Sequence, residues 1–280
     1  MKVSIITINY NNKCGLEKTI NSVVRQTFRD YEFIVIDGGS TDGSKEIIYE
    51  YKSKIDYWVS EPDRGIYHAM NKGVKASHGE YLNFMNSGDC FYGKAVLQNI
   101  FTGNIQEDIV IGKAQTNARV IYPPQQPTLK HFYQHKSLNH QAAFIKRDLL
   151  IKYPYDETHY DIVSDTHFFV QAFIMGNCTY KALDEYVVNF DHNGIGSQNI
   201  KKNRYEQEKV LNNLISPRIL EDYNNICMRY NENPFVRSTA YVVDWIYSGM
   251  KYIPLKRTVR KLSKLFSATV LSIIINKNIL

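Results

Sequence analysis

Residues 81–89 read Tyr-Leu-Asn-Phe-Met-Asn-Ser-Gly-Asp, an apolar run that stops at a carboxylate. A run rich in Tyr, Leu, Phe and Met before Asn-Ser-Gly-Asp is typical of a buried strand that ends in a turn. Gly88 lets the backbone bend, and Asp89 is then expected to face a crevice. Because Asp and Gly are also common in ordinary turns, the stretch alone leaves both interpretations open.

Upstream of this run the chain alternates between strand-like and helix-like segments. Strands are predicted by β-rich apolar runs at 3–8, 31–36 and 57–59. Helices are predicted at 16–24, 44–51 and 66–75. Such alternation implies right-handed crossovers between parallel strands. The sequence therefore predicts an α/β fold, with a mostly parallel sheet covered by helices on both faces.

Every predicted strand in this half ends in polar residues. They are Asn9 and Tyr10, Asp37, Asp63 and Arg64, and residues 86–89. Open α/β sheets bind their ligands at the carboxyl ends of the strands. Four polar clusters at one sheet edge are hard to explain as chance turn composition, so we interpret Asp89 as a site residue.

The second half is less regular and predicts mixed strand pairing. Strands are expected at 108–111, 118–122, 141–145, 179–183 and 186–190, and a short helix at 129–135. Ser164-Asp165 opens a further helix, with Ser164 as its expected N-cap. We divide the chain into a domain at 1–200, with halves at 1–90 and 91–200, and a helical extension at 201–280.

The net charge of +6 belongs to the end of the chain, because the last thirty residues hold seven Lys and Arg and no Asp or Glu. Residues 255–266 place apolar side chains on one helical face and basic ones on the other, as in helices that lie in a membrane interface. Five basic residues there supply at most ~5 kcal/mol toward an anionic surface. The alternative is a helix packed on the domain or on a second subunit of a homo-oligomer. No nucleic-acid-binding motif accompanies these charges.

Cysteine usage and the N-terminus favour a cytoplasmic location, with peripheral attachment to the membrane through the basic helix. The four cysteines form no C-x-x-C pair and suggest neither a zinc site nor a disulfide framework. Polar Asn9 follows the first apolar run too soon for a signal peptide. No apolar run reaches the roughly 18–20 residues that span a bilayer.

The predicted binding edge lacks a Gly-rich phosphate loop, so a metal ion is the expected means of holding an anionic cofactor. Mg²⁺ or Mn²⁺ prefers carboxylate oxygens and bridges to diphosphate, which suits Asp89. Such an ion would neutralise a departing diphosphate. Asp37 is placed to accept hydrogen bonds from a base or ribose, and Tyr10 to stack on a base.

Four segments in this order resemble the inverting family-two glycosyltransferases of the GT-A fold, especially bacterial members that assemble polysaccharides. They are Ser-Ile-Ile-Thr-Ile-Asn-Tyr-Asn at 4–11, Ile-Asp-Gly-Gly-Ser-Thr-Asp-Gly at 36–43, Glu-Pro-Asp-Arg-Gly-Ile-Tyr-His-Ala-Met-Asn-Lys-Gly at 61–73, and Asn-Ser-Gly-Asp at 86–89. Each is weak alone, but the set is specific, and it covers about the first ninety residues.

The resemblance implies a sugar-nucleotide site, with Tyr10 and Asp37 at the nucleoside. The residues expected to hold this co-substrate are Thr7, Asn9, Tyr10, Asp37, Asp63, Arg64 and Ser87. Residues 87–89 stand where the family has its D-x-D metal motif, and Ser87 replaces the first Asp of that motif. Asp89 is therefore the metal ligand expected for Mn²⁺ or Mg²⁺. His192 is a second expected ligand, or else a surface His in a Gly-rich loop.

Ser164-Asp165 resembles the later acidic motif of the family, which implies that Asp165 is the general base toward the acceptor hydroxyl. An Asp at a helix N-terminus is a stronger acid than usual, so a capping role is the alternative. His140-Gln141 lies where relatives carry a similar pair, and either lines the acceptor pocket or belongs to the core. His131 and His135 lack the Glu of an H-E-x-x-H site, which indicates surface helix residues.

We therefore predict an inverting, metal-assisted glycosyltransferase that moves a sugar from a nucleotide diphosphate to a glycan or lipid-linked acceptor. One alternative is a non-catalytic scaffold or glycan-binding module whose metal site has lapsed, as Ser87 suggests. Another is a sugar nucleotidyltransferase, but 9–13 is not the Gly-rich, Arg-containing loop that it needs. A dehydrogenase is excluded because no G-x-G-x-x-G occurs.

Overall fold

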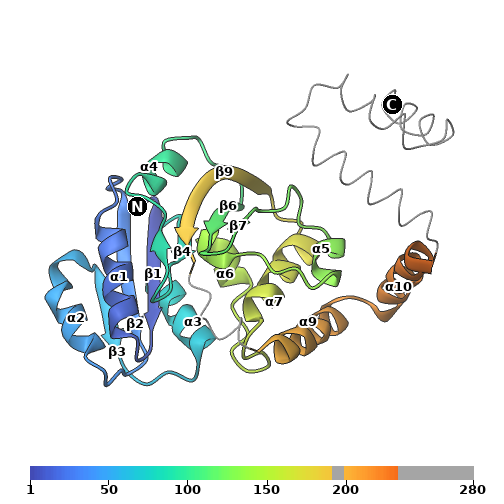
Figure 1. Ribbon diagram of the computed structural model, residues 1–280, viewed down its shortest axis with the longest axis horizontal. Coiled ribbons are helices and arrows are strands. Elements are labelled where there is room, and N and C mark those ends of the chain that lie inside the picture. The colour runs from blue at the N-terminus through green and yellow to red at the C-terminus, as the bar shows by residue number, and fades with distance from the viewer. Residues whose placement is uncertain (191–198, 233–280) are drawn as a thin grey trace. The chain divides into compact units, whose positions relative to one another are not determined.

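The computed structural model describes residues 1–190 and 199–232, drawn as ribbons in Figure 1. His192 and the basic segment at 255–266 lie outside the described residues. The chain divides into two units, Met1–Ile215 and Ser216–Leu280. In the second unit the described element is α10 (Pro217–Glu232), which begins at a proline because the first turn needs no N–H partner there.

The first half of the chain forms the predicted parallel sheet. Its strands are β1 (Val3–Asn9), β2 (Tyr31–Asp37), β3 (Tyr57–Ser60) and β4 (Tyr81–Phe84). They pair in the order β3-β2-β1-β4, and every pair is parallel, which confirms the prediction. The register aligns Asn9 with Asp37 and Asp37 with Ser60, so the polar strand ends meet at one edge.

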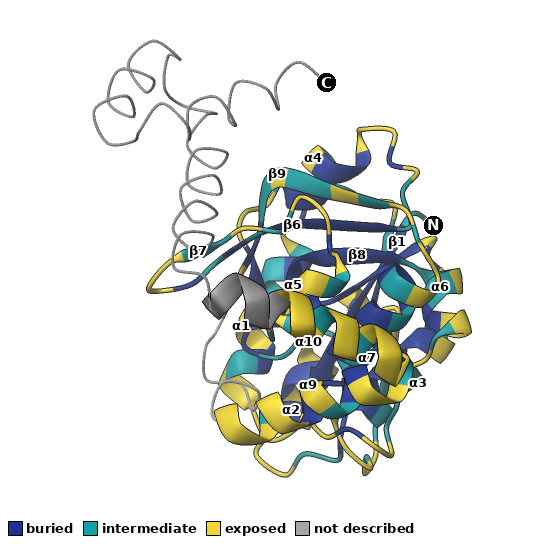
Figure 2. Cartoon of the chain, turned by 90° about the vertical axis from the view of Figure 1, so that its right-hand side faces the viewer, coloured by how far each residue is buried: buried dark blue, intermediate teal, exposed yellow. Residues whose placement is uncertain are grey.

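Helices α1 (Lys13–Val24), α2 (Ser44–Glu50) and α3 (Ile66–Ala76) connect these strands, with a 3₁₀ turn η1 (Lys52–Lys54) before β3. Right-handed crossovers place α1 and α2 on one face of the sheet and α3 on the other. All seven residues of β1 are buried, and α1 buries Leu16, Ile20 and Val23 on its sheet-facing stripe. Figure 2 shows β1 in the buried layer of the sheet, and exposed outer faces on the helices.

The second half extends the same sheet with mixed pairing, as predicted. β8 (Ala143–Lys146) runs antiparallel to β4 and to β6 (Ile109–Gln115), and β9 (Tyr180–Asn189) runs parallel to β6. Two short strands, β5 (Cys90–Phe91) and β7 (Val120–Ile121), pair antiparallel with β9 and β6. The accompanying helices are α4 (Val96–Phe101), α5 (Leu129–Tyr133), α6 (Arg147–Lys152), α7 (Ser164–Val170) and α9 (Ile200–Leu214).

Besides α4, α6 and β5, which were not predicted, three details of the second half differ from the predictions. The two strands expected at 179–183 and 186–190 are one strand, β9, whose register shifts opposite Gly112, where a side chain would meet Val187 and the Glu185 carbonyl. The strand expected from Gln141 begins at Ala143, because Asn139 caps a 3₁₀ turn, η2 (His140–Ala142). Ser164 is the first residue of α7 rather than its N-cap; Val163 precedes the helix, which continues as a π-type turn, η3 (Gln171–Met175).

Candidate active site

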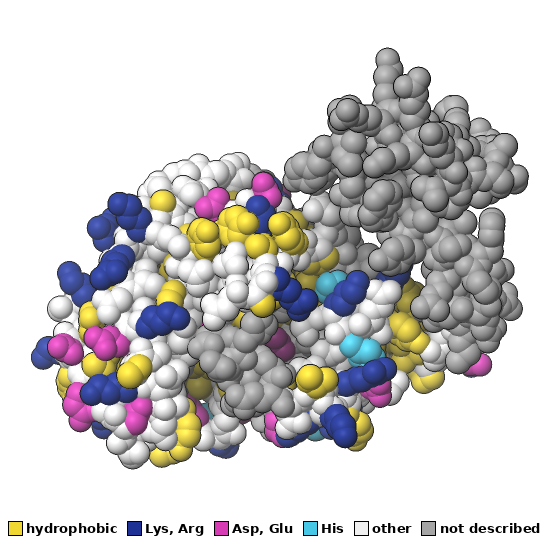
Figure 3. Space-filling model, viewed as in Figure 1, with side chains coloured by type: hydrophobic (Ala, Val, Ile, Leu, Met, Phe, Trp, Pro, Cys, Tyr) yellow, Lys and Arg dark blue, Asp and Glu magenta, His cyan; other side chains and the backbone are white. Residues whose placement is uncertain are grey.

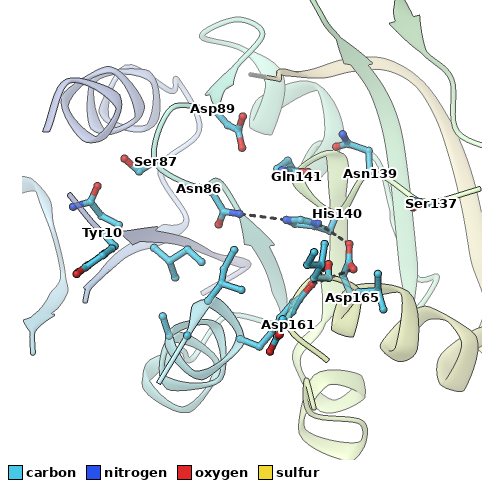
Figure 4. Close-up of a pocket in the computed structure, with 18 of the residues that line it drawn as sticks. Tyr10, Asn86, Ser87, Asp89, Ser137, Asn139, His140, Gln141, Asp161 and Asp165 are labelled. Carbon is cyan, nitrogen blue, oxygen red and sulfur yellow. Dashed lines mark hydrogen bonds and ion pairs between the residues drawn. The ribbon is translucent and has the colours of Figure 1, made fainter. Parts of the chain in front are cut away.

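A cleft of about 990 Å³ lies at the carboxyl ends of the parallel strands and continues to the start of α7. Its side toward β1 and β4 includes Asn9, Tyr10, Asn12, Gly38, Asp63, Asn86, Ser87 and Asp89. Its other side includes Ser137, Asn139, His140, Gln141, Asp161, Asp165 and Asn203. Figure 4 shows Tyr10 and Ser87 on one side, Asp165 on the other and His140 between them.

The described residues that line the cleft include four aspartates, Asp63, Asp89, Asp161 and Asp165, and no Lys or Arg. The Lys and Arg side chains on the face drawn in Figure 3 are dispersed among acidic and neutral ones. A polyanion that enters such a cleft meets carboxylates without a basic lining residue to balance its charge. A bound cation would remove this repulsion.

Asp37 lies beneath the cleft rather than in its lining, and its side chain holds three strand ends together. Its Oδ1 accepts hydrogen bonds from Asn9 Nδ2 (2.8 Å) and Ser40 Oγ (2.5 Å), and its Oδ2 accepts from Ser40 N (2.9 Å) and Ser60 Oγ (2.6 Å). Burial alone would raise the pKa of this carboxyl, but the hydrogen bonds from Ser40, Ser60 and Asn9 outweigh it and lower the pKa. Asp37 is therefore an ionised centre of the cleft wall.

Thr7 and Arg64 also lie outside the lining. Thr7 is fully buried, and its hydroxyl donates to the Met85 carbonyl (2.8 Å). Arg64 is largely exposed and pairs with Glu157 at 2.6 Å, ninety-three residues away in sequence. Neither side chain points its polar atoms at the cleft in this arrangement.

Tyr10 and Asp63 face each other across Gly38 at one end of the cleft. Tyr10 is 70% exposed, and a side chain at position 38 would meet the Tyr10 ring at 3.2 Å and Asp63 Oδ2 at 3.3 Å. Asp63 Oδ1 is held by Lys72 (2.5 Å) and His68 Nδ1 (3.0 Å), whereas its buried Oδ2 has no hydrogen-bond partner among the described residues. An aromatic face beside a free carboxylate oxygen suits a nucleobase with a ring N–H.

Hydrogen bonds from two side chains of α1 hold the loop that follows β4. Thr19 Oγ1 donates to the Asp89 carbonyl (2.7 Å) and accepts from Gly88 N (3.0 Å), while Lys18 Nζ donates to the Gly88 carbonyl (3.0 Å). Gly88 adopts φ +107°, the left-handed region in which only glycine is unstrained. The sequence-based prediction of a glycine bend before Asp89 is confirmed.

Ser87 and Asp89 both line the cleft. Within residues 1–190 and 199–232, no three His, Cys, Asp or Glu side chains gather into a group that could hold a metal ion. Mg²⁺ and Mn²⁺ need fewer protein ligands when substrate phosphates and water complete the shell. The Ser87 hydroxyl donates to the Asn12 carbonyl (3.2 Å), and the buried Asp89 carboxylate supplies the hard oxygen donors that fit such an ion.

Asp165, in the first turn of α7, is joined to both sides of the cleft. Its Oδ2 lies 3.1 Å from His140 Nδ1, and its Oδ1 accepts from Thr166 N (2.8 Å). The Tyr67 hydroxyl lies 3.4 Å from Oδ1, but it donates its proton to the Ile162 carbonyl at 2.6 Å. Burial and the charge of Asp165 raise the pKa of Tyr67, which therefore stays protonated and donates. The remaining ring nitrogen, His140 Nε2, lies 3.3 Å from Asn86 Nδ2.

Sequence reasoning missed several residues on the far side of the cleft. Asn203 comes from α9, which is fastened to the domain by Glu206 accepting from Ile162 N (3.0 Å) and by Gln207 donating to Ser137 (3.0 Å). Asp161 precedes Asp165 by four residues, and its negative charge was the only signal available. Ser137, Asn139 and Asn203 carried no pattern that distinguishes them from loop and helix-surface residues.

Comparisons with known proteins agree with the fold and identify the family. The model of glycosyl transferase family 2 matches residues 4–155. An uncharacterized glycosyltransferase of Mycobacterium tuberculosis is 31% identical over 208 residues, covering 70% of this chain and 77% of that protein. The crystal structure of S. aureus TarS in complex with UDP-GlcNAc is similar with a TM-score of 0.58 and 22% identity, over 71% of this chain and 61% of that chain. A Pyrobaculum calidifontis mannosyltransferase with GDP-Man and Mn²⁺ gives a TM-score of 0.58 and 17% identity, over 94% and 79%.

Proposed function

Because the chain belongs to glycosyl transferase family 2, we propose that it transfers a sugar from a nucleoside diphosphate to an acceptor hydroxyl with inversion, assisted by a divalent metal ion. The observation that carries the proposal is the cleft itself, which has an aromatic ring and a carboxylate, Tyr10 and Asp63, at one end and a carboxylate, Asp165, on the opposite side. Nucleotide-sugar complexes of structurally similar proteins support the class of donor.

At the donor end, the base would stack on Tyr10 and donate its ring N–H to Asp63 Oδ2, the buried oxygen that lacks a partner among the described residues. Asp37 and Thr7 would act from below by fixing the strand ends, through hydrogen bonds with Asn9, Ser40, Ser60 and Met85. Uracil, thymine and guanine each offer a ring N–H, which favours UDP-, dTDP- and GDP-sugars.

Asp89 would hold Mn²⁺ or Mg²⁺ at the diphosphate, and Ser87 lines the same cleft. Such an ion stabilises the negative charge that develops on the departing diphosphate. The absence of Lys and Arg from the described lining residues supports this role, since no other positive charge of the lining faces the phosphates. His192 as a further ligand remains a prediction from the resemblance.

Asp165 would act as the general base. Its carboxylate takes the proton of the acceptor hydroxyl as that oxygen forms a bond to the anomeric carbon, and the bond from that carbon to the diphosphate breaks with its electron pair. Attack from the face opposite the diphosphate inverts the anomeric centre. The polar lining around Asp165, which includes Ser137, Asn139 and Asn203, supports a hydroxyl-rich acceptor such as a glycan.

The acceptor would be a glycan or lipid-linked oligosaccharide at the cytoplasmic face of a membrane, reached through the basic amphipathic segment at 255–266. The five basic residues of this segment, which a helix would place on one face, would attract an anionic surface without inserting the chain into it. Among the described residues no helix has the length and apolar character needed to cross a bilayer.

The test is a thermal-shift panel of UDP-, GDP- and dTDP-sugars with and without Mn²⁺. Stabilisation grows with the ratio of ligand concentration to dissociation constant, so a true donor should raise Tm, and more so with Mn²⁺. Folded Asp89→Asn and Asp165→Asn variants should lose transfer. A scaffold or binding module would show no metal-dependent turnover of any sugar nucleotide, and full activity of both variants would refute the site.

A further inference from the structure

One imidazole, that of His140, joins the two sides of the cleft (Figure 4). Its Nε2 faces Asn86, in the loop that carries Asp89, at 3.3 Å. Its Nδ1 faces Asp165, in the first turn of α7, at 3.1 Å. The side chain of His140 is 15% exposed, so the ring is largely enclosed between these two partners.

The partners determine which nitrogen carries the proton. An ionised carboxylate only accepts hydrogen bonds, so Nδ1 must donate to Asp165. In the neutral ring Nε2 then carries no proton and acts as an acceptor, and the group that faces it is the N–H of the Asn86 amide. Donation thus runs in one direction, from Asn86 through the ring to Asp165. Because Asn86 occupies Nε2, that nitrogen is not free to take a proton from an acceptor.

The backbone that carries His140 is fixed as well. Asn139 Oδ1 accepts from Ala142 N (2.9 Å), which closes the turn η2. The buried amide of Asn83 in β4 donates to the carbonyls of both Gln141 and Ala143, each at 2.9 Å. Because hydrogen bonds fix the turn η2 to the central sheet, the His140 ring can hold the Asp165 carboxylate in one orientation.

We propose that His140 is a positioning residue, which holds Asp165 in the orientation for proton abstraction through its Nδ1–H. This inference rests on the proposed function. Without the ring, Asp165 Oδ2 loses its donor, and the carboxylate keeps the Oδ1 hydrogen bond from Thr166 N and a 3.4 Å contact with the Tyr67 hydroxyl, which donates to the Ile162 carbonyl. A carboxylate held on one oxygen can rotate about its Cβ–Cγ bond. Misplacement of a reacting group by about 1 Å costs roughly a hundredfold in rate.

Three substitutions separate the two nitrogens. His140→Asn places an amide nitrogen near Nδ1 and keeps a donor for Asp165. His140→Gln places its amide group near Nε2 and keeps only the contact with Asn86. His140→Ala removes both. The assay is hydrolysis of the UDP-, GDP- or dTDP-sugar that gives the largest thermal shift, with water as the acceptor and release of the nucleoside diphosphate as the signal.

We expect His140→Ala and His140→Gln to lower kcat about a hundredfold, with KM for the sugar nucleotide and its thermal shift unchanged. His140→Asn should stay within about tenfold of the wild-type kcat, since the donor to Asp165 is restored. The unchanged thermal shift shows that each variant is folded and binds its donor. If His140 had only a structural role, its substitutions would lower Tm, and His140→Asn and His140→Gln would not differ in kcat.

Wild-type kcat in His140→Ala would overturn the inference. A His140→Asn variant as slow as His140→Ala would also overturn it, because the ring itself would then be the base. So would a His140→Gln variant as active as His140→Asn, because the essential contact would then be the one with Asn86. The proposed function fails separately, if the wild-type protein neither binds nor hydrolyses any sugar nucleotide. An inactive Asp165→Asn beside a fully active His140→Ala would leave the function intact and refute only the role of His140.

Discussion

Replacing Asp37 with alanine tests how far the wall of the cleft depends on one buried carboxylate. Asp37→Ala removes an acceptor from the Asn9 amide, which keeps only Ser40 Oγ at 3.2 Å, and from the part-buried Ser40 N–H, at a position where Asp37 itself is fully buried. An unsatisfied buried donor costs about 1–3 kcal/mol, so the two together should lower the free energy of unfolding by ~4 kcal/mol. For a domain of this size each kcal/mol lowers Tm by about 2–4 °C, which gives a loss of ~8–16 °C.

Asp37→Asn is the matched control, because it keeps the shape and removes the charge. Asn9 Oδ1 is buried and has no hydrogen-bond partner among the described residues, so the Asn9 amide can turn to accept from the new N–H. The remaining loss comes from replacing hydrogen bonds to an ion with neutral ones, and we expect about 1–2 kcal/mol. Differential scanning calorimetry measures both variants, with Asp30→Ala as the exposed control.

The gap in Tm between wild type and Asp37→Asn should depend on pH. Since folding lowers the pKa of Asp37, its ionised form stabilises the protein above the pKa of the unfolded chain, and that stability is lost as pH falls through the folded pKa. The gap should be constant from about pH 6 to 8 and narrow below about pH 4. A gap that widens in acid would refute the assignment of the charge.

The same pair of variants separates support from direct contact with the nucleoside. If Asp37 only supports the cleft, Asp37→Asn should bind the sugar nucleotide nearly as well as wild type. If it holds the base or ribose directly, as the family resemblance predicts, Asp37→Asn should show the same loss of Tm but bind the sugar nucleotide much more weakly. An Asp37→Ala variant as stable as Asp30→Ala would refute the four-bond network as a source of stability.

Three further substitutions probe other parts of the site and of the fold. Gly88→Ala places a side chain on a residue at φ +107° and should lower the free energy of unfolding, measured by chemical denaturation, by ~1–3 kcal/mol. The variant should also lose the Mn²⁺-dependent thermal shift. An unchanged thermal shift would show that metal binding does not depend on the bend at Gly88. Asp63→Asn should weaken nucleotide binding, measured by calorimetry, about 10–100-fold, because Lys72 and His68 keep contact with the amide oxygen of the new Asn and leave its N–H facing the base. Glu61→Gln is the control, since Glu61 is exposed and also pairs with Lys72. Equal weakening in both variants would refute the contact between Asp63 and the base. Glu32 is a buried carboxylate that accepts hydrogen bonds from Ser4 and Gly79, and these bonds lower the pKa of Glu32 against the effect of burial. Glu32→Gln should therefore lower the free energy of unfolding by ~1 kcal/mol above about pH 5 and by less in acid, with nucleotide binding unchanged. Altered nucleotide binding would contradict a purely structural role for Glu32.

The parallel half of the fold could be predicted from the sequence because its signals are local. Apolar runs of strand length, polar loops and amphipathic helices follow one another within the first ninety residues, and the handedness of crossovers then orders the strands. The same reasoning brought Asn9, Tyr10, Asp63 and Asp89 to one edge, where all four line the cleft. Family membership also followed from these segments, since they match in order and in residue type.

The second half resisted prediction at points where long-range packing overrides local pattern. β9 runs through residues that look like two strands, because it follows β6 across a register shift at Gly112. Ser164 looks like an N-cap in the sequence, yet the chain enters α7 at Val163 and Ser164 is buried as the first helical residue. Neither feature can be seen without the neighbouring strand or helix.

What the sequence determined by itself is the class of fold, the family and the edge of the sheet at which the cleft lies. Only the tertiary structure decided which side chains reach the cleft: Asp37 and Thr7 turn inward to fix the wall, and Arg64 turns away to Glu157. It also joined Asn86 to His140 across fifty-four residues and His140 to Asp165 across twenty-five. The physical reason is that periodicity reports which face of a strand or helix is buried, whereas a hydrogen bond between distant residues depends on how whole elements pack together.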